Sequence, residues 1–285
     1  MQRPQYLLVI NHVVSSVFKS VEELNKRPEF ANLQVLLITT QPNLIEKYAK
    51  YIEPRHIIIS DFESGVTEAL EPFAADIVGV VCRGDKHIQY LRKLQPHLPS
   101  QVLVASVDSL EAATNKRLMR RDFLKHYPEI TPKFIQVFDD SVDTIEEVEV
   151  AMEYPVIVKP ANLFSSLLIH ACADRIQLKE ALKKTFTNVE DAYSKEGIAI
   201  KPQVIVEEYL DGDFYSIDAF VMDSGEVYCC PPVFYLPAKK IGVDDFFLYK
   251  RTMPSGLDEE ETAKAAETTK KAVNAIGLTH SAVHM

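Results

Sequence analysis

The sequence predicts an α/β protein in which an N-terminal doubly wound parallel sheet is followed by an α+β domain. Up to about residue 105, short runs of β-branched and other apolar residues alternate with helix-like segments. This alternation is typical of a parallel sheet with helices on both faces. From about residue 134 the segments read as a smaller α+β unit. A chain of 285 residues is long enough for both domains.

The N-terminal region is expected to contain strands separated by helices. The strands are predicted at residues 6–10, 35–39, 57–60, 77–82 and 102–105, and the helices at 16–26, 44–52, 65–74 and 86–94. After the first strand the chain reads Asn-His-Val-Val-Ser-Ser, without the glycine-rich fingerprint of dinucleotide-binding folds. The region therefore predicts a fold but no cofactor.

The remaining elements follow from periodicity and turn residues. Strands are predicted at 134–137, 156–158, 167–172 and 204–208, and helices at 109–127, 141–151, 176–185 and 258–275, with the polar residues 188–195 as a connection. A hairpin is expected from 215–221 and 227–230, and a strand-like run ends the chain at 281–285. The predicted domains are residues 1–107 and 108–285.

Composition excludes several classes of function. The net charge of −10 argues against non-specific nucleic-acid binding and against attachment to anionic membranes. No apolar run approaches the roughly 18 residues needed to span a bilayer, and the N-terminus lacks a signal-peptide pattern. The cysteines lie in or beside apolar segments, so Cys229-Cys230 is either two thiols of one strand or a redox or metal pair. Reduced thiols fit a cytoplasmic protein.

Two strand ends carry residues suited to nucleotide binding. The apolar run at 154–158 ends on Lys159 and Pro160, and the run at 204–206 ends on Glu207 and Glu208. One strand that delivers a cation and another that delivers acceptors would grip a nucleotide. The alternatives are an exposed lysine at a strand end and a solvated pair of glutamates.

These two segments and three others resemble, in the same order, the ATP-binding core of the ATP-grasp superfamily of the carboxylate–amine (amino-acid) ligase type. The others are residues 115–120, Pro132 before a strand, and residues 275–284 with Gly277 and His284. The resemblance covers about residues 105–285 and implies a lid subdomain at about 133–203. Residues 1–107 would then be the pre-ATP-grasp domain that usually precedes this core.

The resemblance implies a set of ATP-binding residues. Lys116 and Lys159 would contact the α- and β-phosphates, although spacing alone would let Lys116 lie over the edge of the core. Main-chain groups of Glu208 and Leu210, with the Glu207 carboxylate, would read the adenine. Asp213 is the nearest candidate for the ribose, because the usual glutamate position holds Phe214. The whole expected set is Lys116, Lys159, Ser165, Ser166, Glu207, Glu208, Leu210 and Asp213.

The chain departs from the family pattern in two places. The loop after the second lysine, residues 161–168, contains no glycine, whereas most relatives cover the terminal phosphates with a glycine-rich loop. Ser166 aligns with the loop serine and Ser165 would support it. The second departure is that the family's Mg²⁺ ligands follow the His284 region. We therefore expect a chain truncated before its metal site, which alone forms little or no ADP.

The expected function is an ADP-forming, ATP-dependent carboxylate–amine ligase with an acyl-phosphate intermediate, acting on small molecules. Residues 244–251 would line the acceptor side or form a surface loop. A homo-oligomer is compatible with the sequence. The alternative is a nucleotide-binding sensor or scaffold module without ligase chemistry. A doubly wound protein that binds something unrelated to ATP is a third hypothesis.

Overall fold

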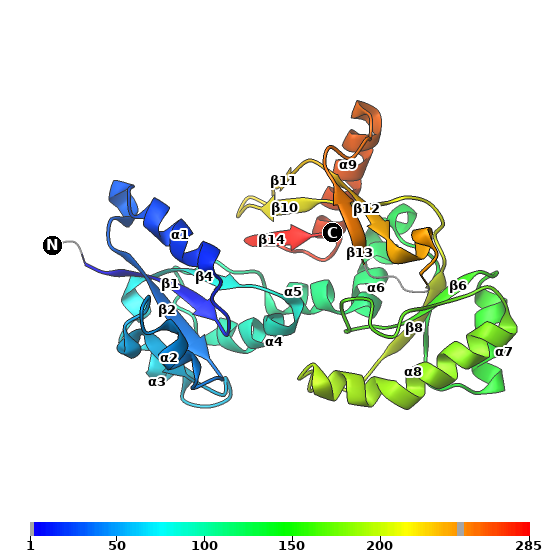
Figure 1. Cartoon of the computed structure of the whole chain (residues 1–285), viewed down its shortest axis with the longest axis horizontal. Helices are drawn as coiled ribbons and strands as arrows, with labels where there is room; N and C mark the ends of the chain where they lie inside the picture. The colour runs from blue at the N-terminus through cyan, green and yellow to red at the C-terminus, as the bar shows by residue number, and fades with distance from the viewer. Residues whose placement is uncertain (1–2, 244–247) are drawn as a thin grey trace. The chain divides into compact units, whose positions relative to one another are not determined.

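The computed structural model describes residues 3–243 and 248–285. The chain divides into two compact units, Met1–Val107 and Asp108–Met285 (Figure 1). Within the described residues, no helix is both long enough and apolar enough to cross a membrane.

The first unit is built on a parallel sheet with the strand order β3-β2-β1-β4. Its elements are β1 (Gln5–Ile10), α1 (Ser15–Leu24), β2 (Leu33–Thr39), α2 (Leu44–Tyr48), β3 (Ile57–Ile59), α3 (Val66–Leu70), β4 (Ile77–Cys82) and α4 (Asp85–Leu94). Val9 and Leu37 pack against α1 and α2, while the alternate residues Leu8 and Leu36 are also fully buried. Both faces of the sheet are thus covered, and the predicted doubly wound α/β fold is confirmed.

The strand predicted at residues 102–105 was wrong. The Val102 N–H bonds to the Pro99 carbonyl at 2.9 Å, which closes a turn there instead of joining a ladder.

The second unit contains a four-stranded antiparallel sheet, called here the lid sheet, with the order β5-β8-β6-β7. Its strands are β5 (Phe134–Val137), β6 (Val156–Pro160), β7 (His170–Cys172) and β8 (Val204–Glu208). Two helices, α7 (Val142–Ala151) and α8 (Arg175–Lys195), pack on one face through Val148 and Leu182 (Figure 1). The polar residues 188–195 are helical rather than a connection, because Val189 and Tyr193 continue the buried stripe of α8.

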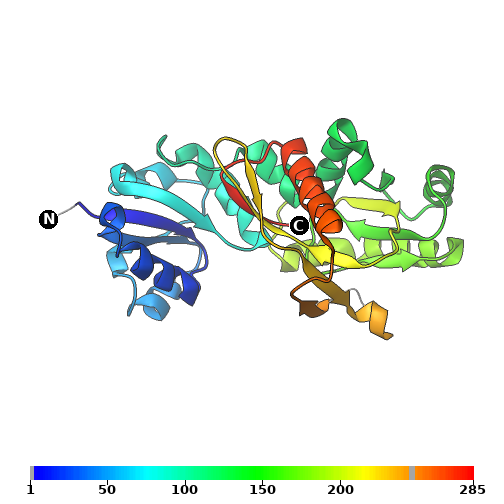
Figure 2. The ribbon, with the colours of Figure 1, turned by 90° about the horizontal axis from the view of Figure 1, so that it is seen from above.

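Two three-stranded sheets complete the second unit. One has the order β13-β12-β9 and the other β11-β10-β14. Their strands are β9 (Phe214–Ser216), β10 (Asp218–Val221), β11 (Val227–Cys229), β12 (Val233–Pro237), β13 (Leu248–Thr252) and β14 (Ser281–His284). The predicted hairpin exists as β10–β11, and Figure 2 shows helix α9 beside it. Cys229 ends β11, which fits the strand interpretation of the vicinal cysteines.

The strand predicted at 215–221 is two strands in different sheets. Ile217 lies between them, and its N–H and C=O both bond to Met285. The chain therefore changes sheets at a residue that the apolar pattern does not mark. Of the predicted loop 244–251, residues 244–247 lie outside the described residues, and residues from Leu248 onward form β13 rather than a loop.

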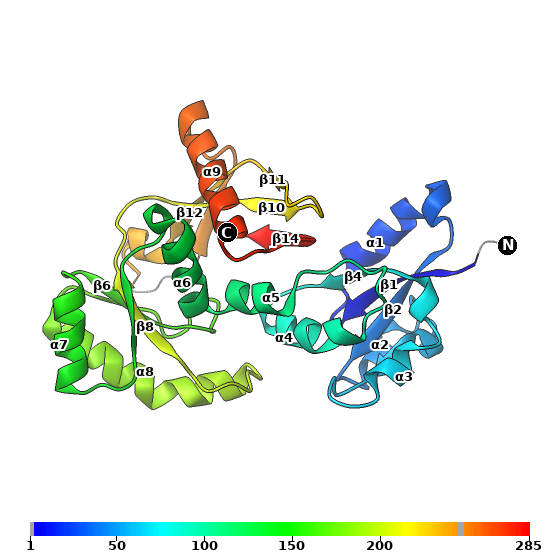
Figure 3. The same cartoon turned by 180° about the vertical axis from the view of Figure 1, so that it is seen from behind.

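The helix predicted at 109–127 is also two elements, α5 (Val107–Thr114) and α6 (Lys116–His126). Asn115 between them has extended backbone angles, and its side chain accepts the N–H groups of Arg117 and Leu118. This is an N-cap, which starts a new helix. Phe123 of α6 packs against Ala272 and Ala275 of α9 (Glu259–Ala275), and the two helices are seen together in Figure 3.

Candidate functional site

The face of the lid sheet opposite α7 and α8 carries Lys159 and Glu207. In the β6–β8 ladder Ile157 lies opposite Glu207, and Lys159 lies opposite Ile205. Residues opposite each other in an antiparallel pair point to the same face, and every second residue shares that face. Lys159 and Glu207 therefore share the face away from the α7–α8 core. Val158 and Val206 point into that core.

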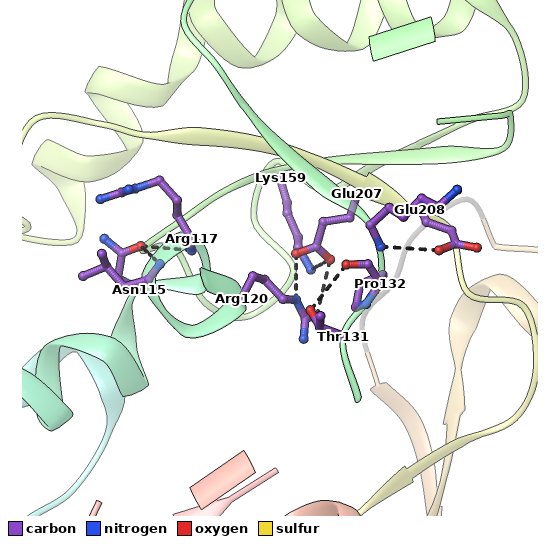
Figure 4. A network of polar contacts seen from close by, with 10 residues as sticks. Asn115, Arg117, Arg120, Thr131, Pro132, Lys159, Glu207 and Glu208 are labelled. Atoms are coloured by element: carbon purple, nitrogen blue, oxygen red, sulfur yellow. Dashed lines mark hydrogen bonds and ion pairs between the residues drawn. The ribbon is translucent and has the colours of Figure 1, made fainter. Parts of the chain in front are cut away.

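Glu207 is the centre of a buried group of three charges. Its side chain is only 2% exposed, and it comes from β8. The Lys159 Nζ of β6 lies 2.6 Å from its Oε2, and the Arg120 Nε of α6 donates to its Oε1 at 2.9 Å. An Arg120 Nη atom reaches Oε2 at 3.4 Å (Figure 4). The carboxylate is thus bound by a forked arginine and by a lysine.

The electrostatics of this group follow from burial and from its charges. Burial alone would raise the pKa of the Glu207 carboxyl, but Lys159 and Arg120 hold that pKa below its usual value. Burial lowers the pKa of the Lys159 ammonium, and Glu207 offsets part of this effect. Two cations and one carboxylate give the group a net charge of +1 in its ionised form. A buried carboxylate without such partners would be strongly unfavourable.

Lys116 contacts the loop that follows Lys159. Its Nζ donates to the Leu163 carbonyl, and its backbone N–H donates to the Ala161 carbonyl at 2.9 Å. Because α6 starts at this lysine, Lys116 does not lie on the apolar stripe of a long helix, as its spacing suggested. Its amine is instead next to the backbone of residues 161–163.

The loop of residues 161–169 is held against α8. Leu163 is buried with Val189 and Tyr193 of α8, and Leu168 packs on the same cluster. The Asn162 N–H also donates to the Tyr193 hydroxyl at 3.1 Å. This segment is therefore anchored by its own side chains.

The same loop has a backbone that usually favours glycine. Ser165, Ser166 and Leu168 have φ of 55°, 59° and 55°, in the left-handed region. The loop therefore adopts glycine-like turns without containing a glycine. Both of its serines lie within this left-handed part.

The predicted adenine and ribose residues are not gathered around Glu207. Glu208 points to the opposite face, where its carboxylate accepts the Lys133 N–H at 3.4 Å and lines a pocket with Lys133, Glu149 and Glu153. Its own N–H bonds to the Lys133 carbonyl at 3.0 Å. The Leu210 side chain is 59% exposed, and Asp213 is exposed as well. Of the predicted set, the structure pairs Lys159 with Glu207 and places Lys116 against the loop that carries Ser165 and Ser166.

Sequence reasoning missed the role of Arg120. This residue lies in the segment that resembled the first-lysine region, but nothing local indicates its partner, since Glu207 is 87 positions away. The available signal was the buried glutamate itself, because a carboxylate on a buried strand requires a cation. Gln203 adds a second link to α6: its Oε1 accepts from Asn115 Nδ2 at 3.2 Å and from Arg117 Nε at 3.0 Å.

Comparison with known proteins finds a family model that matches part of the chain. Residues 152–285, which include β6, the loop and β8, match the family model of the ATP-grasp domain. This match confirms the resemblance to the ATP-grasp superfamily that the sequence motifs indicated. ATP-grasp proteins generally use ATP with Mg²⁺.

Two curated relatives of the chain are named as ligases. The chain is 27% identical over 192 residues to an alanine–anticapsin ligase from Bacillus subtilis (strain 168), covering 63% of this chain and 39% of that protein. It is 29% identical over 151 residues to a D-alanine–D-alanine ligase from Bacillus cytotoxicus, covering 49% of this chain and 36% of that protein. The matches thus span less than half the length of these two ATP-grasp relatives.

Solved structures share the fold of this chain. An L-amino acid ligase from Bacillus licheniformis superposes with a TM-score of 0.71 at 19% identity, covering 100% of this chain and 64% of that one. An N5-carboxyaminoimidazole synthetase from Staphylococcus aureus complexed with ADP gives 0.69 at 14% identity, covering 100% of this chain and 66% of that one.

The ATP-grasp family implies Mg²⁺, and the described residues do not fit a site for it. In residues 3–243 and 248–285, no three His, Cys, Asp or Glu side chains come together in a way that could hold a metal ion. The group at Glu207 does not provide one either, because both carboxylate oxygens already face cations.

Proposed function

We propose that this chain binds ATP and forms part of an ADP-forming ligase that joins a small-molecule carboxylate to an amine. The observation that carries the proposal is the group of Lys159, Glu207 and Arg120 on the face of the lid sheet opposite α7 and α8. Lys159 and Glu207 lie on strands inside the ATP-grasp match, and Arg120 comes from helix α6. Together the three side chains offer net positive charge to a phosphate. The ligases among the sequence relatives support the reaction type.

The residues take the following proposed roles. Lys159 attracts the nucleotide phosphates, and Lys116 with Ser165 and Ser166 holds them at the loop. The Glu207 carboxylate is already bound by two cations, so adenine would be read by main-chain groups near Glu208 and Leu210 instead. Asp213 remains the proposed ribose contact.

The proposed chemistry has two displacements. A carboxylate oxygen of the first substrate attacks the γ-phosphorus of ATP, and ADP leaves. The amine of the second substrate then attacks the acyl carbon, phosphate leaves, and the amine loses a proton. Positioning and charge stabilisation would be the protein's contribution. Amino acids are the proposed substrates, because the relatives are named as ligases of alanine. No step is assigned to Mg²⁺, and a cytoplasmic location stays a prediction.

Nucleotide binding is tested on the 285-residue chain by calorimetric titration with ATP and ADP. We expect Lys159→Gln to weaken binding by tenfold or more, which corresponds to about 1.4 kcal/mol. Lys179→Gln is the matched control, because Lys179 is an exposed lysine in the first part of α8, away from Val189 and Tyr193, which hold the loop. Equal binding by wild type and Lys159→Gln would contradict the proposed site. The expectation that this chain alone forms little ADP is checked with the same samples.

A nucleotide-binding module without ligase activity is the second candidate. The anchored, glycine-free loop favours it, because relatives close a flexible glycine-rich loop over the phosphates. The two candidates are separated by measuring ADP release from the product of the complete natural reading frame, with pools of amino acids. Release that depends on the amine supports the ligase. Tight nucleotide binding without any amine-dependent release supports the module.

A further inference from the structure

The charges of Lys159, Glu207 and Arg120 indicate a role for Arg120. Lys159 lies 2.6 Å from the Glu207 carboxylate, and a lysine paired so closely attracts a phosphate weakly, because the carboxylate repels the same phosphate. Lys159 and Glu207 alone would have no net charge. The third member of the group therefore decides whether a phosphate is attracted.

Arg120 is placed to neutralise Glu207. It approaches the carboxylate with Nε at 2.9 Å from one oxygen and with an Nη atom at 3.4 Å from the other. Its side chain is 18% exposed, and its guanidinium lies 6.0 Å from the centre of the Phe123 ring. Since Phe123 packs against α9, the arginine extends from a fixed helix.

We propose that Arg120 is a positioning residue of the nucleotide site, which takes up the negative charge of Glu207 and so leaves the Lys159 ammonium attractive to a phosphate. This inference rests on the proposed function, because it assumes that a nucleotide phosphate approaches Lys159. Glu207 in turn fixes the ammonium at the end of β6. The two residues thus have different tasks. Glu207 holds the Lys159 side chain in place, and Arg120 cancels the charge of Glu207.

The test is a charge cycle with ADP and adenosine as ligands. The group carries +1 in wild type, 0 in Arg120→Gln, +2 in Glu207→Gln and +1 in the double variant Arg120→Gln/Glu207→Gln. We expect Arg120→Gln to bind ADP at least tenfold more weakly than wild type does. Its affinity for adenosine should stay within twofold of the wild-type value. The double variant should bind ADP within threefold of wild type, and Arg120→Lys should stay close to wild type.

The outcomes separate this inference from the proposed function. Absence of ADP and ATP binding by wild type would contradict the proposed function itself. Binding by wild type with equal losses for ADP and adenosine in Arg120→Gln would show a merely structural arginine and overturn the inference. A double variant as weak as Arg120→Gln would overturn it too. Circular dichroism confirms that each variant is folded, and the double variant carries the test if Arg120→Gln alone does not fold.

Discussion

Glu207 couples the stability of the protein to acid pH. Its folded-state pKa is lowered from 4.5, so the carboxylate stays ionised to lower pH in the folded protein than in the unfolded chain. The stabilisation is therefore present above the unfolded pKa and is lost as pH falls through the folded one. We expect the free energy of unfolding to fall less steeply below about pH 5 in Glu207→Gln than in wild type.

This prediction is measured by urea unfolding at several pH values. Glu207→Gln should also be less stable than wild type near neutrality, because two buried cations then lack their anion. Glu226→Gln, in the exposed β10–β11 turn, is the control and should follow wild type. If the free energy of unfolding changed with pH in the same way in wild type and Glu207→Gln, the coupling between Glu207 and acid stability would be refuted.

At the scale of single residues, the sequence indicated two of the three charged residues of the group. Lys159 and Glu207 stood out because each ends a buried strand, and the structure does join them. Arg120 could not be paired with Glu207, since helix and strand meet only in the tertiary fold. The direction of Glu208 depends on strand register, which a resemblance of motifs does not provide.

Among the elements, the start of α6 depends on one side chain. Asn115 accepts two backbone N–H groups and also donates to Gln203. We expect Asn115→Ala to lower the free energy of unfolding by about 1 kcal/mol or more. Asn115→Asp keeps the capping oxygen, so its free energy of unfolding should fall by less. Equal losses in the two variants, measured by urea unfolding, would rule out capping as the cause.

The anchored loop is the second element with a measurable role. Leu163 anchors the loop of residues 161–169 to α8, and its side chain is only 3% exposed. We therefore expect Leu163→Ala to lower the free energy of unfolding by about 2–5 kcal/mol and to release the loop. Hydrogen exchange of residues 161–169 should accelerate in this variant. Leu167→Ala is the control, because Leu167 is 40% exposed in the same loop. Unchanged exchange in Leu163→Ala would show that the loop is held by something else.

Elements were predictable where pattern and turn residues agreed. The parallel strands β1 to β4 are apolar runs between helices, and the β10–β11 hairpin has its turn at Asp223-Ser224-Gly225. The division at Ile217 was not predictable, because a change of sheet leaves the apolar pattern intact. The break at Asn115 was hidden inside a helical pattern, although asparagine is a common N-cap.

For the whole molecule, the division into the units Met1–Val107 and Asp108–Met285 predicts which part a bound nucleotide protects from hydrogen exchange. The group of Glu207 and the anchored loop belong to the unit Asp108–Met285. We expect added ATP to slow hydrogen exchange in this unit, above all in β6, β8 and residues 161–169, and to leave β1 to β4 unchanged. The Lys159→Gln variant is the control and should show little slowing. Protection centred on residues 3–107 would place the nucleotide elsewhere.

The anchoring of Leu163 and Leu168 on α8 has a consequence for the calorimetry of binding. A loop that folds onto its ligand buries new apolar surface, and its binding enthalpy then changes steeply with temperature. Here that surface is buried before any nucleotide arrives. If residues 161–169 receive the phosphates in this seated form, titrations at successive temperatures should give nearly the same enthalpy, the sign of a preformed receptor.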